Sequence, residues 1–239
     1  MATTSTAPQA ADPGAGLTAG PLVVLGGGEH ARVVIDAART QGDRWTVQGY
    51  VAPEAGAAPP AANLPWLGDD AGFAARLGDL APDARPWLVL GFGGGDIIGA
   101  LAARSAITER FPGARWATIV HAAAWVSPEA TLESGAVVLA GAIVNTGAHV
   151  LRHAIVNSAA VVEHDVHIGG GSHVAPGAVI GGGARIGDHA FIGLGARVRD
   201  HIEVGAGAVV GMGAVVVESI APGMTVLGVP ARPHDPERP

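Results

Sequence analysis

The chain has 239 residues and a formal net charge of −7 at neutral pH; it contains no Cys, and all 14 of its basic residues are Arg. This length allows one or two domains with a sizeable core, and an acidic chain without a basic cluster is a poor match for nucleic acid. Missing Cys excludes thiol nucleophiles, thiolate metal sites and disulfides, and it is compatible with the cytoplasm, where we expect the protein to act. Missing Lys excludes Schiff-base chemistry and a Walker-type phosphate site.

The N-terminal segment 1–19 is rich in Ala, Thr and Pro, with no basic start and no apolar core. We therefore expect a disordered tail there and not a signal peptide. The sequence contains no apolar run of 18 residues, so no membrane-spanning segment is expected.

Strand and helix patterns alternate over residues 20–120. The strands are expected at 21–25, 45–51, 86–91 and 116–120, and the helices at 29–40, 69–77 and 96–110. This order predicts a small Rossmann-like parallel α/β domain.

A glycine turn, Gly26-Gly27-Gly28, follows the first of these strands and opens the first helix. Free N–H groups and the positive end of the helix dipole at such a turn can hold a phosphate or pyrophosphate. The turn and the nearby His30 are therefore candidate binding residues for a nucleotide. A packing turn with no ligand is the alternative.

From Val126 to Ile220 the chain has a period of six residues. Val, Ile or Leu occupies every sixth position, sixteen times out of sixteen, and the residue four places later is Ala at twelve of these positions and Ser at Ser172. A solenoid needs such a period because each short strand and corner presents one aliphatic and one small residue inward. Three hexads make one triangular coil, so the pattern predicts a parallel β-helix over residues 121–233.

Residues 18 apart then stack in columns along the corners. One predicted column contains Thr146, His164 and Gly182, and another contains Ile155, His173 and Phe191. Phe191 is expected on the surface, where it would suit packing between subunits.

Four segments together resemble one known family: GGGEHARVV at 26–34, NSAAVVEHD at 157–165, SHVAPG at 172–177 and GVPAR at 228–232. The chain resembles the hexapeptide-repeat acyltransferases with a left-handed parallel β-helix, in the branch of sialic-acid O-acetyltransferases and nucleotide-amino-sugar N-acetyltransferases. Two positions depart from the pattern of that branch. Glu29 stands where the family's turn has its last Gly, and Ala-Pro-Glu at 52–54 replaces an Asp-Asp pair that helps to recognise the base. The resemblance therefore leaves open which nucleotide base is bound.

The resemblance implies an N-acetyltransferase that uses acetyl-CoA and a nucleotide-linked amino sugar, most simply a 4-amino-4,6-dideoxy sugar, for surface-glycan synthesis. It implies a homotrimer whose acceptor pocket lies between neighbouring β-helices, and no metal. His164 would be the general base, since an imidazole accepts a proton near neutral pH. Asp165 would orient it, and the Gly182 N–H would stabilise the oxyanion.

The resemblance also implies which residues hold the two substrates. The expected contacts to the acceptor come from Asn157, Glu163 and His173, together with the glycine turn and His30. The expected contacts to the coenzyme come from Gly182, Leu194, Gly195, Met212 and Arg232.

Three other interpretations fit the same residues. The first is O-acetylation of a sialic-acid-like sugar, which would use the same His. The second is a trimeric zinc hydratase with His164, His167 and His173 converging across an interface. The third is a non-catalytic β-helix scaffold.

Overall fold

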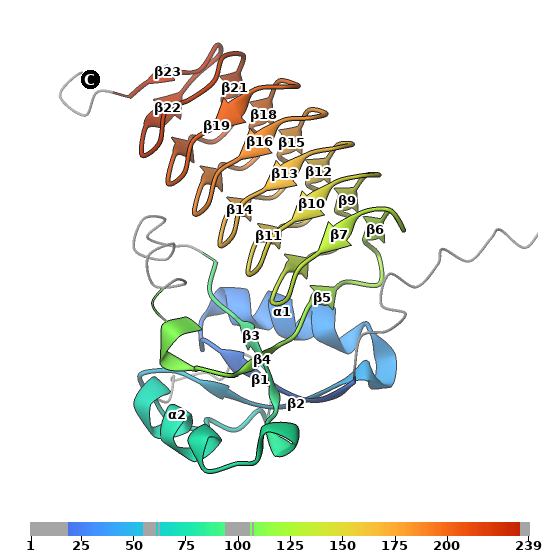
Figure 1. Cartoon of the computed structure of the whole chain (residues 1–239), viewed down its shortest axis with the longest axis vertical. Helices are drawn as coiled ribbons and strands as arrows, with labels where there is room; N and C mark the ends of the chain where they lie inside the picture. The colour runs from blue at the N-terminus through green and yellow to red at the C-terminus, as the bar shows by residue number, and fades with distance from the viewer. Residues whose placement is uncertain (1–18, 55–60, 62, 94–105, 107, 235–239) are drawn as a thin grey trace, which may run out of the picture.

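The computed structural model describes residues 19–54, 61, 63–93, 106 and 108–234. The tail predicted for 1–19 and most of the helix predicted for 96–110 lie outside these residues, although 108–110 are helical. Figure 1 shows two units, a small α/β domain and a long β-helix that stands on it. The predicted fold class is confirmed.

The N-terminal domain is built on a parallel four-stranded sheet in the order β2-β1-β3-β4. Its strands are β1 (Gly20–Leu25), β2 (Trp45–Val51), β3 (Trp87–Leu90) and β4 (Arg115–Trp116). The chain leaves β1 toward β2 on one side, whereas β3 lies on the other. The ends of β1 and β3 therefore form a topological switch point, where open α/β sheets bind ligands.

One helix covers each face of this sheet. Helix α1 (Glu29–Arg39) is amphipathic: Ala31, Val34 and Ile35 are buried, and it lies between the sheet and the β-helix. Helix α2 (Asp70–Gly78) packs on the opposite face. Its Asp69 N-cap accepts a hydrogen bond from the Gly72 N–H, which satisfies one of the free N–H groups of the first turn. Two short 3₁₀ turns, η1 (Gly42–Arg44) and η2 (Pro82–Ala84), precede β2 and β3.

The β-helix has three flat faces made of very short strands. Face I contains β5 (Ile119–Val120), β8 (Val137–Val138), β11 (Ile155–Val156), β14 (His173–Val174), β17 (Phe191–Ile192), β20 (Val209–Val210), β22 (Thr225–Leu227) and β23 (Arg232–Pro233). Face II contains β6 (Trp125–Val126), β9 (Ile143–Val144), β12 (Val161–Val162), β15 (Val179–Ile180), β18 (Arg197–Val198) and β21 (Val215–Val216). Face III contains β7 (Thr131–Leu132), β10 (His149–Val150), β13 (His167–Ile168), β16 (Arg185–Ile186) and β19 (Glu203–Val204).

The hexad pattern accounts for the core of the β-helix. In each two-residue strand the second residue points inward, and the small residue four places later fills the next corner. Ser172 occupies one of these inward corner positions and is fully buried. Its Oγ donates to the Gly187 carbonyl at 2.7 Å and accepts from the Ala190 N–H at 3.2 Å, so its polar atom is satisfied.

The two units share one hydrophobic core at their junction. Strand β5, whose residues we expected to close the N-terminal sheet, pairs instead with β8 on face I of the β-helix. Ile119, Val137 and Ile155 pack in the same cluster as the buried side of α1. Val120 and Ala124 keep the hexad phase that we traced from Val126, so the sequence did carry a signal for this earlier strand.

We expect the stability of the fold to fall below neutral pH because of His167 on face III. Burial lowers the pKa of its imidazole below 6.5, and the nearby His149 and Arg185 lower it further. As pH falls below 6.5, the imidazole of His167 is protonated in the unfolded chain before it is protonated in the folded one. The stability that neutral His167 contributes to the fold is therefore complete above that pH and is lost as pH falls through the folded pKa. In a His167→Gln variant the melting temperature should depend less steeply on pH between about 7.5 and 5. Parallel curves for the two proteins would contradict this.

Candidate active site

The glycine turn adopts the predicted strand–turn–helix geometry. Gly26 has φ of 126°, and a Cβ there would lie 3.0 Å from the Gly91 carbonyl oxygen. A Cβ on Gly27 would lie 3.1 Å from the Tyr50 ring, so at both positions a side chain would require its neighbours to move. Gly28, the N-cap of α1, meets nothing within 4 Å. The exposed helix N-terminus therefore opens toward the switch point of the sheet.

A cavity of about 490 Å³ joins this turn to the β-helix. The N-terminal domain lines it with the start of α1 and the loop after β3, and the β-helix lines it with face I and the corner that follows. The lining residues are Gly28, Glu29, His30, Val33, Gly91, Phe92, Gly93, Asn157, His173, Ala175, Pro176, Phe191 and Leu194. Four of the predicted acceptor contacts, Gly28, His30, Asn157 and His173, thus lie around one space.

A chain of hydrogen bonds crosses the wall of this cavity. Asn157 accepts a hydrogen bond from the Ser158 N–H at 2.7 Å, and its Nδ2 lies 2.9 Å from His173 Nε2. His173 Nδ1 lies 2.6 Å from the carbonyl oxygen of Gly93, in the loop after β3. Asn157 and His173 are both buried, at 8% and 5% exposure. Gly93 was not among the predicted site residues, although the glycine-rich run after the third predicted strand was a visible signal.

His164 lies elsewhere, on the corner between faces II and III. Its Nδ1 is 3.0 Å from Asp165 Oδ2, and the two side chains are 54% and 72% exposed. Asp165 has a positive φ of 58°, and its carboxylate lies over Gly147, where a side chain would collide with it. The arrangement leaves Nε2 of the imidazole directed along the column toward Gly182.

Gly182 follows His164 in the same column, as the hexad spacing predicts. A Cβ on Gly182 would lie 2.5 Å from His164 Nε2. At two equivalent corner positions the N–H is capped by the preceding Asn side chain, as Ser158 is by Asn157. Gly182 is preceded by Gly181, and its N–H donates no hydrogen bond to any other described residue. A free backbone N–H therefore lies in the same column as an exposed imidazole.

The structure distributes the other predicted residues over separate regions. Leu194 and Met212 stack on the corner between faces I and II, at 48% and 75% exposure, with Gly195 beside them. Arg232 is exposed in β23, and its Nη1 donates to the carbonyl of Ala231. Glu163 accepts a hydrogen bond from Asn145 at 2.9 Å and so has a partner within the β-helix.

One expectation about a surface residue needs correction. Phe191 is only 6% exposed; it packs edge-on against the His173 ring at 5.3 Å, so it is not a surface residue. The three His of the hydratase alternative lie on different sides of the β-helix: His164 on a corner, His167 on face III and His173 on face I. One chain does not bring them together.

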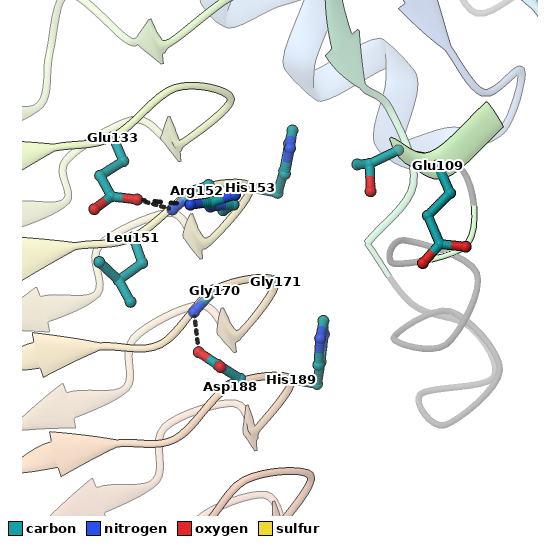
Figure 2. Close-up of a pocket in the computed structure, with 10 residues that line it drawn as sticks. Glu109, Glu133, Leu151, Arg152, His153, Gly170, Gly171, Asp188 and His189 are labelled. Atoms are coloured by element: carbon teal, nitrogen blue, oxygen red, sulfur yellow. Dashed lines mark hydrogen bonds and ion pairs between the residues drawn. The ribbon is translucent and has the colours of Figure 1, made fainter. Parts of the chain in front are cut away.

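A second cavity, of about 480 Å³, lies between residues 108–109 and the corner that joins face III to face I. Figure 2 shows Glu109 on one side and His153 and His189 on the other. Two acidic side chains of this cavity accept hydrogen bonds from backbone groups at the corners of the β-helix. Asp188 accepts one from the Gly170 N–H at 2.7 Å, and Glu133 accepts one from the Arg152 N–H at 3.1 Å. None of the predicted site residues lines this cavity.

Among the described residues, no group of three or more His, Cys, Asp or Glu side chains is placed to hold a metal ion. No helix in the described part of the chain has the length and apolarity needed to cross a membrane.

Comparison with known proteins identifies the family. The acetyltransferase domain of PglB from Neisseria gonorrhoeae FA1090 is 33% identical with a TM-score of 0.79, over 90% of this chain and 99% of that one. PerB from Caulobacter crescentus, solved in complex with CoA and GDP-perosamine, is 31% identical with a TM-score of 0.77, over 90% and 98%. WeeI from Acinetobacter baumannii AYE, at 17% identity and a TM-score of 0.54, shares the fold. No protein-family model and no curated protein matches the sequence.

The first two similarities span nearly the whole of each chain at 30% identity or more, and they include both the glycine-turn domain and the β-helix. The chain therefore belongs to the hexapeptide-repeat acyltransferases, in the branch that contains the nucleotide-amino-sugar N-acetyltransferases.

Proposed function

We propose that this protein transfers the acetyl group of acetyl-CoA to the amine of a nucleotide-linked amino sugar. The observation that carries the proposal is the shared cavity, in which the N-terminus of α1, whose N-cap Gly28 makes no side-chain cap, faces Asn157 and His173 of the β-helix. A helix N-terminus suits a diphosphate, and the β-helix side suits the sugar that extends from it. The relatives support the chemistry, because one is solved with acetyl coenzyme A and another is named a perosamine N-acetyltransferase.

In this reaction His164 is the general base. Its Nε2 takes the proton of the sugar amine as the nitrogen attacks the thioester carbon, and Asp165 holds Nδ1 and stabilises the imidazolium. The Gly182 N–H stabilises the negative oxygen of the tetrahedral intermediate. When the C–S bond breaks, the coenzyme leaves as a thiolate that takes up the proton. No covalent acyl-enzyme is needed, in keeping with the missing Cys.

A second copy of the chain completes the site. Within one chain, His164 and Asn157 lie on two different corners, at opposite edges of face II. The outer side of face II is apolar over its first three coils, where Trp125 and Ile143 are exposed and Val161 is partly exposed in the same row; Arg197 lies further along that row. A neighbouring subunit packed on this face would bring its His164 corner to the Asn157 corner. Three such contacts give the homotrimer.

The coenzyme then occupies the groove between two subunits. One wall is the corner that presents Leu194, Gly195 and Met212, and the other is the corner of Gly182. The exposed apolar side chains suit the pantetheine arm, and Arg232, at the far end of the β-helix, suits a phosphate of the coenzyme.

The function is tested by an acetyl-transfer assay with UDP-, GDP- and dTDP-linked amino sugars and, in parallel, free sialic-acid-like sugars. We expect turnover with an amino-sugar nucleotide and a product acetylated on nitrogen, identified by mass spectrometry. Turnover on a sugar hydroxyl alone would favour the O-acetyltransferase alternative. Absence of acetyl transfer to every acceptor would reject the proposed function.

The assembly is tested by placing a charge on face II. Ile143→Asp should shift the protein from trimer to monomer in light scattering, and it should lower activity by at least tenfold, because a carboxylate cannot be buried unpaired at an interface. Thr131→Asp is the matched control, since Thr131 occupies the equivalent outer position on face III. A monomeric parent, or equal effects of the two substitutions, would contradict the proposed interface.

A further inference from the structure

Two backbone groups fix both the orientation and the protonation state of the Asn157–His173 pair. A carbonyl oxygen only accepts, so the 2.6 Å contact with Gly93 requires a proton on His173 Nδ1. The Ser158 N–H only donates, so it fixes the Asn157 oxygen and turns the amide nitrogen toward His173. That nitrogen also donates, and His173 Nε2 must therefore be the bare acceptor.

The tautomer leaves His173 without a ring nitrogen for the acceptor sugar. Its Nδ1–H is directed to the N-terminal domain and its Nε2 to Asn157. The ring is also enclosed by Phe191, edge-on at 5.3 Å, and by His30 at 6.1 Å. Asn157, by contrast, keeps one N–H of its amide, and it lines the cavity.

We propose that His173 is a positioning residue, which transmits the placement of the Gly93 loop to Asn157 so that the remaining Asn157 N–H meets a carbonyl or hydroxyl oxygen of the substrates. This inference rests on the proposed function and specifies that Asn157 contacts the substrates while His173 holds Asn157 in place. The loop after β3 borders the glycine turn, since Gly91 lies against Gly26. The domain that would bind the nucleotide is thereby coupled to the amide that contacts the reacting groups.

The tautomer is measured first, and this does not need activity. In the full chain labelled with ¹⁵N-histidine, the His173 signals are assigned by their loss in His173→Phe, or in His173→Gln should the Phe variant not fold. We expect a proton on Nδ1 and a bare Nε2. A proton on Nε2 would overturn the proposal.

Kinetics then separate positioning from a purely structural role. His173→Phe keeps the ring but loses both hydrogen bonds, and we expect kcat to fall about 10- to 100-fold while KM for acetyl-CoA stays within about threefold. His173→Gln restores an acceptor for Asn157 and should recover at least about tenfold of that loss. Unchanged kcat in His173→Phe, or a Gln variant no better than Phe, would overturn the proposal. A parent with no acetyl transfer would instead reject the proposed function and leave the tautomer result standing.

Discussion

Replacing His164 by Ala is expected to lower kcat about 10²- to 10⁴-fold, with little change in KM for acetyl-CoA. General-base catalysis contributes this range, and no other imidazole lies on the same column. The side chain is 54% exposed, and among the described residues it forms an ion pair with its neighbour Asp165 alone, so the melting temperature should stay close to that of the parent.

The matched control is His189→Ala. His189 is also a corner histidine, but it lies on the corner between faces III and I and lines the second cavity. Its removal should leave kcat within about twofold of the parent. If His164→Ala retained activity within about threefold, the imidazole would not be the base, and a scaffold function would become the better interpretation.

Gly182→Ala is expected to lower kcat about 100-fold through a collision with the catalytic imidazole. The added Cβ would lie 2.5 Å from His164 Nε2, so the ring must turn away from the position where it can take the proton. Because the ring is 54% exposed and can turn into solvent, stability should change little. The measurement is kcat together with a thermal melt.

Gly170→Ala provides the control for this substitution. Gly170 occupies the same corner position two hexads earlier, but a Cβ there would meet Arg152 at 3.5 Å, an ordinary contact. A double variant, His164→Ala with Gly182→Ala, tests this cause. Without the imidazole ring there is no collision, so kcat of the double variant should be close to that of His164→Ala alone. Additive losses would show that Gly182 acts independently of His164.

The β-helix could be predicted almost completely from the sequence, because its contacts are between residues at a fixed spacing. Each inward Val, Ile or Leu packs on the one 18 places later, so the period alone fixes the register, as in the pair Val156 and Val174. The same rule placed Gly182 next to His164. The beginning of the β-helix was missed at Ile119–Val120, although Val120 and Ala124 keep the hexad phase, because these residues end a segment that we assigned to a strand of the N-terminal sheet.

The candidate site was predicted only in part. The residues were found by their types and spacing, and the acceptor pocket was expected between neighbouring β-helices. One chain holds Asn157 and His173 in a cavity and His164 on another corner, an arrangement that residue types and spacing did not predict. Phe191 was expected on the surface because its hexad position points outward. It is buried because the loop after β3 and the start of α1 cover that part of face I.

The sequence by itself determined the coil, its core and the column that contains the imidazole, since these depend on local periodicity and on steric limits that repeat every 18 residues. Only the tertiary structure decided how the N-terminal domain lies on face I, and with it the contact from the Gly93 carbonyl to His173. That contact joins residues 80 positions apart on two differently built units. No repeat relates them, so their meeting follows from the packing of α1 on the first coils and cannot be seen in any local pattern.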